Sequence, residues 1–195
     1  QKYRANFTIQ KTNNMTIQSL PLGCGTDKKL GAIGVDILRG SQADVIHNLN
    51  KFPYPFKSST FDEIIAENVI EHLDNIPKVM EEIHRISKNG AKLLITTSHF
   101  TSVDSFTDPT HRHFFTSRSF DYFIPKTDLY KYGYSKFRYK KIAVFVGPHN
   151  SNSLLLKLLL ALINKYLVFY EKRLAFLFPV GTITFKLEVV KNGKT

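Results

Sequence analysis

The sequence contains a single cysteine, Cys24, among its 195 residues. One cysteine cannot form an intramolecular disulfide, and Cys24 has no CxxC partner with which to hold a structural zinc ion. The first twenty residues also lack an apolar stretch of the length that a secretory signal needs. These absences exclude a disulfide framework and a zinc finger, and they predict a cytoplasmic protein.

Glycines are few where nucleotide-binding loops require them. Gly23 and Gly25 have no third glycine at the spacing of a dinucleotide-binding motif, and no Gly-Lys-Ser/Thr follows this pair as in a phosphate-binding loop. Sites for nicotinamide cofactors and for nucleoside triphosphates are therefore disfavoured.

The length and composition fit one soluble globular domain over residues 1–195. Hydrophobic residues make up 43% of the chain and charged residues 22%, as in ordinary folded proteins. No internal repeat or low-complexity linker divides the chain. Residues 1–14 precede Met15 and the first strand-like run, and we expect them to form a disordered extension.

Positive charge is concentrated in the last two fifths of the chain. Residues 118–195 hold 14 Lys/Arg against 4 Asp/Glu, a balance of +10, whereas residues 1–117 hold 13 against 12, a balance of +1. This asymmetry favours an anionic partner, which could be nucleic acid, an acidic small molecule or a membrane surface. A solvated basic face without a partner is the alternative.

Short apolar runs bounded by turn residues predict strands, and the segment 76–87 has apolar residues at helical spacing up to a helix stop at Asn89-Gly90. Strands alternating with a helix and glycine-containing turns predict an α/β fold with a three-layer, doubly wound, mainly parallel sheet. The expected strands cover residues 16–22, 32–37, 43–47, 61–66, 91–97, 141–146 and 182–190.

The segment 154–172 predicts one strongly apolar helix. Its polar residues form a narrow stripe that includes Lys157, Asn164 and Glu171. Lysines interrupt it too often for a membrane span. We expect the rest of the protein to cover this helix, in preference to a helix that lies on a membrane surface.

The glycine loop and Asp36 form a pair with chemical meaning. Gly23-Cys24-Gly25 follows the first predicted strand and lets the backbone approach a ligand, and Asp36 ends the second. In open α/β sheets a carboxylate at this place accepts hydrogen bonds from a ribose diol. The pair therefore predicts a ribose-containing ligand.

The segments LPLGCGTDKK, GVDI, FDEIIAENVIEHL and LLITTS follow one another in the chain. They resemble the successive motifs of class I S-adenosylmethionine-dependent methyltransferases, the type 11 group especially, over about residues 20–100. The segment DPTHRHFFTSRSF at 108–120 resembles a stretch of many uncharacterised members. The resemblance implies a Rossmann-like fold, the cofactor S-adenosyl-L-methionine, and an acceptor-side cap or insertion over 118–175.

The resemblance also implies a cofactor site. In it Asp36 would hold the ribose, Asn48 and Leu49 would border the adenine, and Glu67 and Asn68 would line the methionine side. The implied site comprises Gly23, Cys24, Gly25, Asp36, Ile37, Asn48, Leu49, Glu67 and Asn68.

The chain departs from the family pattern at several positions. Pro21 stands where an acidic residue is usual, Asp27 where a third glycine is common, and Asn48 where an aspartate often lies beside the adenine. Only residues 24–31 separate the first two strands, which is short for a parallel crossover. We therefore expect the first helix to be nearly absent.

The segment 108–115 holds the candidate catalytic residues Asp108, His111 and His113. A histidine near neutral pKa can take a proton from a hydroxyl or amine during methyl transfer. Alternatively, the histidines hold the loop on the sheet by hydrogen bonds, and alignment of the reactants alone promotes transfer. No further ligand accompanies these residues in the sequence, so we predict no metal site.

Two other residues with reactive side chains, Glu71 and Cys24, are expected to have structural roles. Glu71, followed by His72, would stabilise the N-terminus of the helix after the fourth strand. Cys24 would pack in the glycine loop.

The sequence thus predicts in-line methyl transfer to a small-molecule, saccharide or lipid-linked acceptor with an anionic part and an apolar part, with S-adenosylhomocysteine released. Peripheral membrane contact is a further expectation. A nucleic-acid methyltransferase or binding protein that uses the basic region, and a non-catalytic scaffold with a cofactor fold, are the alternatives.

Overall fold

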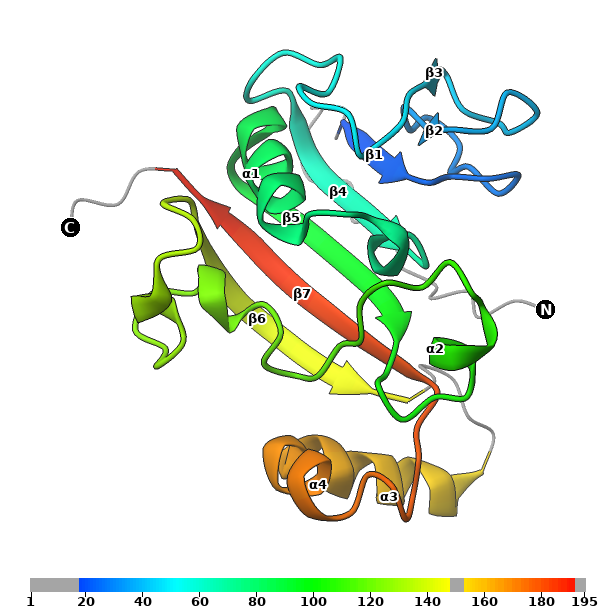
Figure 1. Cartoon of the computed structure of the whole chain (residues 1–195), viewed down its shortest axis with the longest axis vertical. Helices are drawn as coiled ribbons and strands as arrows, with labels where there is room; N and C mark the ends of the chain where they lie inside the picture. Colours follow the sequence, from blue (N-terminus) through cyan, green and yellow to red (C-terminus); the bar gives the residue numbers. More distant parts are fainter. Residues whose placement is uncertain (1–17, 148–152, 192–195) are drawn as a thin grey trace.

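The computed structural model describes residues 18–147 and 153–191. Seven strands form one sheet in the order β3-β2-β1-β4-β5-β7-β6 (Figure 1). The first five strands are parallel, and β7 is antiparallel to both β5 and β6. The strands are β1 Ser19–Leu22, β2 Val35–Asp36, β3 Val45–Ile46, β4 Phe61–Glu67, β5 Ser87–Ser98, β6 Arg138–Val146 and β7 Thr182–Val190.

This topology confirms the predicted Rossmann-like α/β sheet, and the last predicted strand, 182–190, belongs to it as β7. The predicted extension 1–14 lies outside the described residues. The helices are α1 Ile76–Ile86, α2 Asp104–Thr107, α3 Leu154–Lys165 and α4 Leu167–Arg173, with 3-10 turns η1 Ile70–His72, η2 Asp121–Phe123 and η3 Tyr130–Tyr132.

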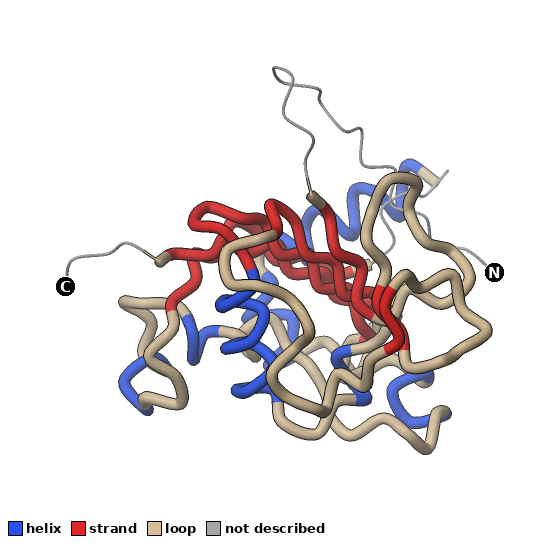
Figure 2. The backbone as a smooth tube through the Cα atoms, turned by 90° about the horizontal axis from the view of Figure 1, so that it is seen from above, coloured by secondary structure: helices blue, strands red, loops and turns tan. Residues whose placement is uncertain are grey.

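Helices lie on both faces of the sheet. Figure 2 shows the sheet nearly edge-on, with α1 on one side and the α3–α4 pair on the other. Among the described residues, no helix connects β1 to β2 or β2 to β3. The near absence of a first helix is therefore confirmed, and the glycine loop passes almost directly into the next strand.

Helix α1 covers the centre of the sheet. The Asn75 side chain accepts a hydrogen bond from the backbone N–H of Lys78 and caps the helix, while Met80 and Ile83 are fully buried. These side chains pack with the inward residues of β4, β5 and β7, and burial of this apolar surface is the main source of stability. The hydroxyl of Tyr139 on β6 donates to the carbonyl of Met80 at 2.6 Å and fixes the helix against the sheet.

The predicted helix stop at Asn89-Gly90 is wrong. Helix α1 ends at Ile86, and Ser87 is already extended and pairs with Phe61. The register between β4 and β5 then shifts by a bulge, in which Gly90 has φ +78°. Gly90 thus allows the positive φ of a β-bulge, and not that of a helix C-terminus.

The single helix predicted over 154–172 is also wrong. The backbone leaves helical geometry at Tyr166, so α3 and α4 are separate. The expectation that this segment is covered is wrong as well, because Ile163 is the only residue of α3 that the structure buries. Asn164 fixes α3 to the edge strand β6 by hydrogen bonds with both the N–H and the carbonyl of Val146.

The predicted cap 118–175 supplies β6, α3 and α4. Helix α4 is attached to the loop after β5 through Glu171, whose carboxylate accepts from the backbone N–H and the hydroxyl of Ser117 at 2.6 and 2.7 Å. No described helix is long and apolar enough to span a bilayer.

Candidate active site

The glycine loop is tied to the second strand by Asp36. The backbone N–H of Gly25 donates to Asp36 Oδ2 and that of Leu38 donates to Oδ1, both at 2.8 Å. Asp36 is only 6% exposed. A buried carboxylate that accepts two backbone N–H groups is well stabilised, and it holds the loop in one conformation.

Two glycines give this loop its shape for different reasons. Gly23 has φ +62°, and a Cβ there would lie 2.7 Å from the Val69 side chain. Gly25 has φ +52°, but a Cβ there would meet no atom of the described residues within 4 Å. Gly23 is therefore required by packing, whereas the backbone at Gly25 borders open space that a ligand can occupy.

Cys24 packs inside the same loop. Its Sγ lies 2.7 Å from the place that a Cβ of Gly34 would take. Burial, and then the negative charge of Asp36, raise the pKa of the Cys24 thiol. A thiol held protonated in this way is a poor nucleophile.

The residues expected at the adenine differ in their surroundings. Ile37 beside Asp36 is 59% exposed and can contact a planar ring. Leu49 is buried, and its carbonyl accepts from the Tyr54 hydroxyl at 3.0 Å. Asn48 uses its Oδ1 locally, as acceptor for the N–H of Asn50. Ile37 is thus the most accessible apolar contact of this group.

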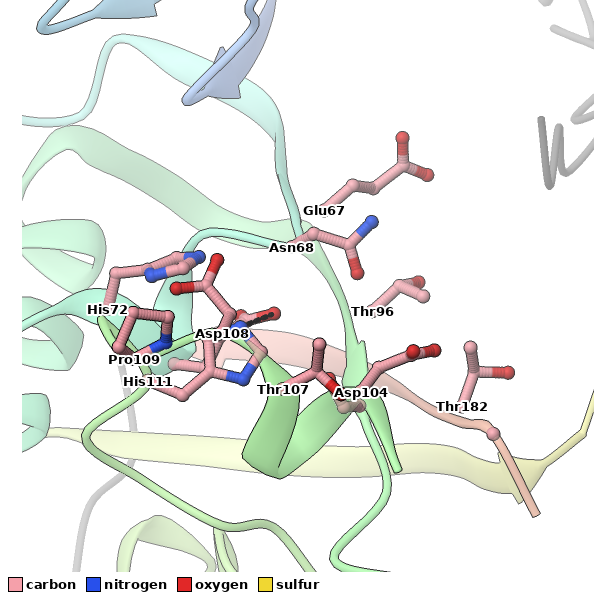
Figure 3. A pocket seen from close by; sticks show the side chains of 13 residues that line it. Glu67, Asn68, His72, Thr96, Asp104, Thr107, Asp108, Pro109, His111 and Thr182 are labelled. Carbon is pink, nitrogen blue, oxygen red and sulfur yellow. Dashed lines mark ion pairs between the residues drawn. The ribbon is translucent and has the colours of Figure 1, made fainter. Parts of the chain in front are cut away.

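A pocket of about 640 Å³ opens at the carboxyl ends of β4 and β5 (Figure 3). Among the residues that the structure describes, no lysine or arginine lines it, and four of the lining residues are acidic. The lining residues are Glu67, Asn68, Glu71, His72, Thr96, Ser98, Asp104, Thr107, Asp108, Pro109, His111, Gly181 and Thr182. None belongs to 118–147 or 153–175, so the described part of the predicted cap does not line this pocket.

Glu67 and Asn68 form the border of the pocket nearest the glycine loop. Asn68 has φ +50°, a left-handed conformation that asparagine tolerates better than most residues, and its N–H donates to the Thr96 carbonyl. Partial burial raises the pKa of the Glu67 carboxyl. Lys29 acts to lower this pKa, and Asp27 acts to raise it. The structure thus brings both residues to the pocket.

Not all candidate catalytic residues of the segment 108–113 lie in the pocket. Asp108 and His111 line the pocket. His113 is outside it, and its Nε2 lies 2.7 Å from the carbonyl of Leu73. The hydrogen bonds from Thr110, first through its hydroxyl and then through its backbone N–H, lower the pKa of Asp108. Asp108 therefore remains a carboxylate, while His113 attaches the loop to the turn after η1.

Glu71 and His72, which the sequence pattern assigned to a helix N-terminus, belong to the pocket instead. The cap of α1 is Asn75, and Glu71 is a buried residue of the separate turn η1. Glu71 Oε1 lies 4.0 Å from His111 Nε2, and the rings of His72 and His111 are 4.7 Å apart at their centroids. The adjacent Glu-His pair was visible in the sequence, but its contact with His111 depends on the folding of the later loop.

Two comparisons of sequence show what this chain is similar to. A family model described as a methyltransferase domain matches residues 16–130. An uncharacterized protein of Methanocaldococcus jannaschii is 49% identical over 41 residues, which are 21% of this chain and 18% of that protein. The chain therefore matches less than a fifth of this relative.

Solved structures show the same fold at low identity. A SAM-dependent methyltransferase from Archaeoglobus fulgidus has a TM-score of 0.58 and 17% identity, with 88% of this chain and 86% of that chain covered. Phosphoethanolamine N-methyltransferase 2 of Haemonchus contortus, solved with S-adenosyl-L-methionine, has a TM-score of 0.54 and 14% identity, with 92% and 50% covered.

Proposed function

The chain belongs to the family of S-adenosyl-L-methionine-dependent methyltransferases, and we propose that it methylates a hydroxyl or amine of a small, neutral or cationic acceptor. The observation that supports this acceptor class is the acidic pocket beside the glycine loop. Its volume suits a small molecule. Because the described residues of its lining include four carboxyl groups and no lysine or arginine, an anionic group would be repelled there.

The glycine loop fits the extended methionine part of the cofactor. The open space above Gly25 gives room for it, and the carboxylate of Asp36 has lone pairs beyond the two that accept backbone N–H groups. Those lone pairs would bind a ribose diol, with Ile37 against the adenine. Bound in this way, the cofactor supplies an electrophilic methyl group on sulfur.

The residues around the pocket would orient the acceptor. Ser98 on β5 and Thr182 on β7 are paired neighbours that both line it, and hydroxyls can donate to or accept from a polar molecule. His111 Nδ1 lies 3.2 Å from the carbonyl of Ser105, so this nitrogen donates and the lone pair stays on Nε2. That lone pair can accept the acceptor proton or bind a cation.

An acceptor panel tests the proposed function. We expect S-adenosylhomocysteine to form with neutral polyols, saccharides or amines, and not with their phosphorylated forms or with RNA. Asp36→Ala should lose this turnover, while Leu30→Ser, at a fully exposed site, should keep it. Turnover confined to RNA or to phosphorylated acceptors would overturn the acceptor class. Cofactor binding without any turnover would favour the scaffold alternative.

A further inference from the structure

Three side chains that line the pocket, those of Glu71, His72 and His111, form the donor set of a metal site. The ligand atoms of Glu71, His72 and His111 all lie within 4.8 Å of one another. Metal bonds of about 2.0–2.2 Å require ligand atoms roughly 3–4 Å apart, so small side-chain rotations would close this set on one ion. The cluster includes neither His113 nor Asp108.

The carboxylate of Glu71 is an independent sign of a missing partner. Its side chain is 2% exposed, and Oε2 is buried without a hydrogen-bond partner among the described residues. A buried, unpaired carboxylate is strongly unfavourable, because it has lost water and gained no compensating interaction. His111 does not relieve this, since it approaches only Oε1, at 4.0 Å. A bound cation would.

Hydrogen bonds outside the cluster prepare both histidines as ligands. Besides the contact of His111 with Ser105, His72 Nδ1 lies 2.8 Å from the hydroxyl oxygen of Thr110, whose own hydrogen goes to Asp108 Oδ1 at 2.7 Å. Both Nδ1 atoms are therefore donors, and both lone pairs reside on Nε2. Metal-ligating histidines are typically oriented by such contacts to a carbonyl or carboxylate.

We propose that Glu71, His72 and His111 bind one divalent transition metal ion. Imidazole and carboxylate ligands suit Zn²⁺ and Mn²⁺, and three protein ligands leave coordination positions open toward the pocket. A metal ion at this site favours acceptors that are methylated on oxygen. A diol with two adjacent hydroxyls would bind best, because both oxygens could coordinate the ion.

The chemical role of the ion, unlike its binding, rests on the proposed methyl transfer. The acceptor hydroxyl binds the cation, which lowers the pKa of that hydroxyl, and its proton leaves to water. An oxygen lone pair forms the new O–C bond, while the S–C bond breaks with its electrons on sulfur. No side-chain base is then required, and the His111 lone pair is used by the metal.

Direct metal titration tests this site. We expect the full chain, freed of metal by a chelator, to bind one Zn²⁺ by calorimetry and one Mn²⁺ by electron paramagnetic resonance. Glu71→Gln, His72→Gln and His111→Gln should each weaken binding at least tenfold. His113→Gln is the matched control, because glutamine can still donate to the Leu73 carbonyl and this residue lies outside the cluster.

Thermal unfolding and binding of S-adenosylhomocysteine, measured on the same samples, distinguish loss of the metal site from loss of the fold. Without metal, Glu71→Gln should melt no lower than the wild type, because it removes an unpaired buried charge. No saturable metal binding by the folded wild type, or equal binding by the three variants, would overturn the site. Metal binding without binding of S-adenosylhomocysteine would instead contradict the proposed function alone.

A separate surface, formed by α3, α4 and the turn that follows, is apolar and exposed. We name it the leucine surface; its exposed large apolar residues are Leu154, Leu155, Leu156, Leu158, Leu159, Leu162, Tyr166, Val168, Phe169, Leu174, Phe176, Leu177 and Phe178. An apolar patch of this extent marks an interaction site.

The charges on the leucine surface identify its partner. Every exposed charged residue within 154–178 is basic, namely Lys157, Lys165, Lys172 and Arg173. The one acid, Glu171, is buried against Ser117. A symmetric contact between two copies would bring these cations together. Apolar residues bordered by lysines match an anionic bilayer surface, on which a helix as short as α3 lies flat.

We infer that the leucine surface docks on anionic membranes. The full chain should cosediment with vesicles of phosphatidylcholine and phosphatidylglycerol, and much less with phosphatidylcholine alone. The triple change Leu155→Ser, Phe176→Ser and Leu177→Ser should reduce binding at least tenfold, while Leu30→Ser, exposed elsewhere, should not. No binding to the anionic vesicles, or a wild-type dimer that the triple change dissociates, would overturn this inference.

Discussion

Asp36 at the end of β2 holds Gly25 in the loop after β1, through a hydrogen bond of 2.8 Å from the backbone N–H to Oδ2. Strands β1 and β2 are parallel neighbours in the sheet, and no helix lies between them in the chain. The Asp36 carboxylate thus holds the loop in place, where a crossover helix is absent. The same carboxylate would bind the ribose, so loop order and cofactor affinity are coupled.

The two loop glycines should respond differently to substitution by alanine. Both changes place a side chain at positive φ, which costs about 1–2 kcal/mol. Gly23→Ala also collides with Val69, so it should lower the free energy of unfolding by about 1–3 kcal/mol more than Gly25→Ala does. Gly25→Ala should instead mainly weaken cofactor binding. Urea unfolding and calorimetry measure the two effects, and equal destabilisation by both changes would contradict the geometry.

Asn68 allows backbone strain and side-chain contact to be separated. Asn68→Gly keeps the left-handed conformation at no steric cost, whereas Asn68→Ala is strained by about 1 kcal/mol. Alanine should therefore lower thermal stability below that of the glycine variant. If the Asn68 amide contacts the methionine part of the cofactor, both variants should lose the same affinity for S-adenosylhomocysteine. Unchanged affinity in both would remove Asn68 from the cofactor site.

Glu171 should be the main attachment of α4. Glu171→Ala leaves the N–H and hydroxyl of Ser117 without their acceptor, and loss of hydrogen bonds to a charged group should cost about 2–4 kcal/mol. The exposed neighbour Lys172 provides the control, since Lys172→Ala should change stability by less than about 0.5 kcal/mol. Chemical unfolding of both variants measures this, and similar values for the two would show that α4 is held elsewhere.

His84 should make the fold sensitive to acid. Burial lowers the pKa of His84, against the effect of the Val190 carbonyl at 3.1 Å. A lowered folded-state pKa means that its contribution to stability is complete above pH ~6.5, the unfolded value, and is lost as pH falls toward the folded value. His84→Gln should show a flatter decline of unfolding free energy between pH 7 and 5. Parallel declines for both proteins would exclude His84 as the cause.

The parts of the fold that local patterns specify could be predicted from the sequence. Apolar runs and, for the last strand, alternation predicted each strand of the sheet. The short separation of the first two predicted strands, residues 24–31, predicted the missing helix. Asn89-Gly90 misled because a positive φ serves a bulge as well as a helix end. The break between α3 and α4 at Tyr166 could not be predicted, because no glycine or proline lies near it in the sequence.

The candidate site was harder to predict because it depends on contacts across the fold. His111 and His113 are two residues apart, yet one lines the pocket and the other bonds Leu73 outside it. Glu71 and His72 join the pocket only because the later loop folds back over η1. No single segment contains that information.

The glycine loop that Asp36 holds in place is the proposed binding site of S-adenosylmethionine. Calorimetric titration of S-adenosylmethionine and S-adenosylhomocysteine into the wild type and Asp36→Ala, with folding checked by circular dichroism, tests it most directly. We expect one saturable site in the wild type and at least a tenfold loss of affinity in the variant. A folded wild type that binds neither ligand, or a variant that binds both equally well, would contradict the account.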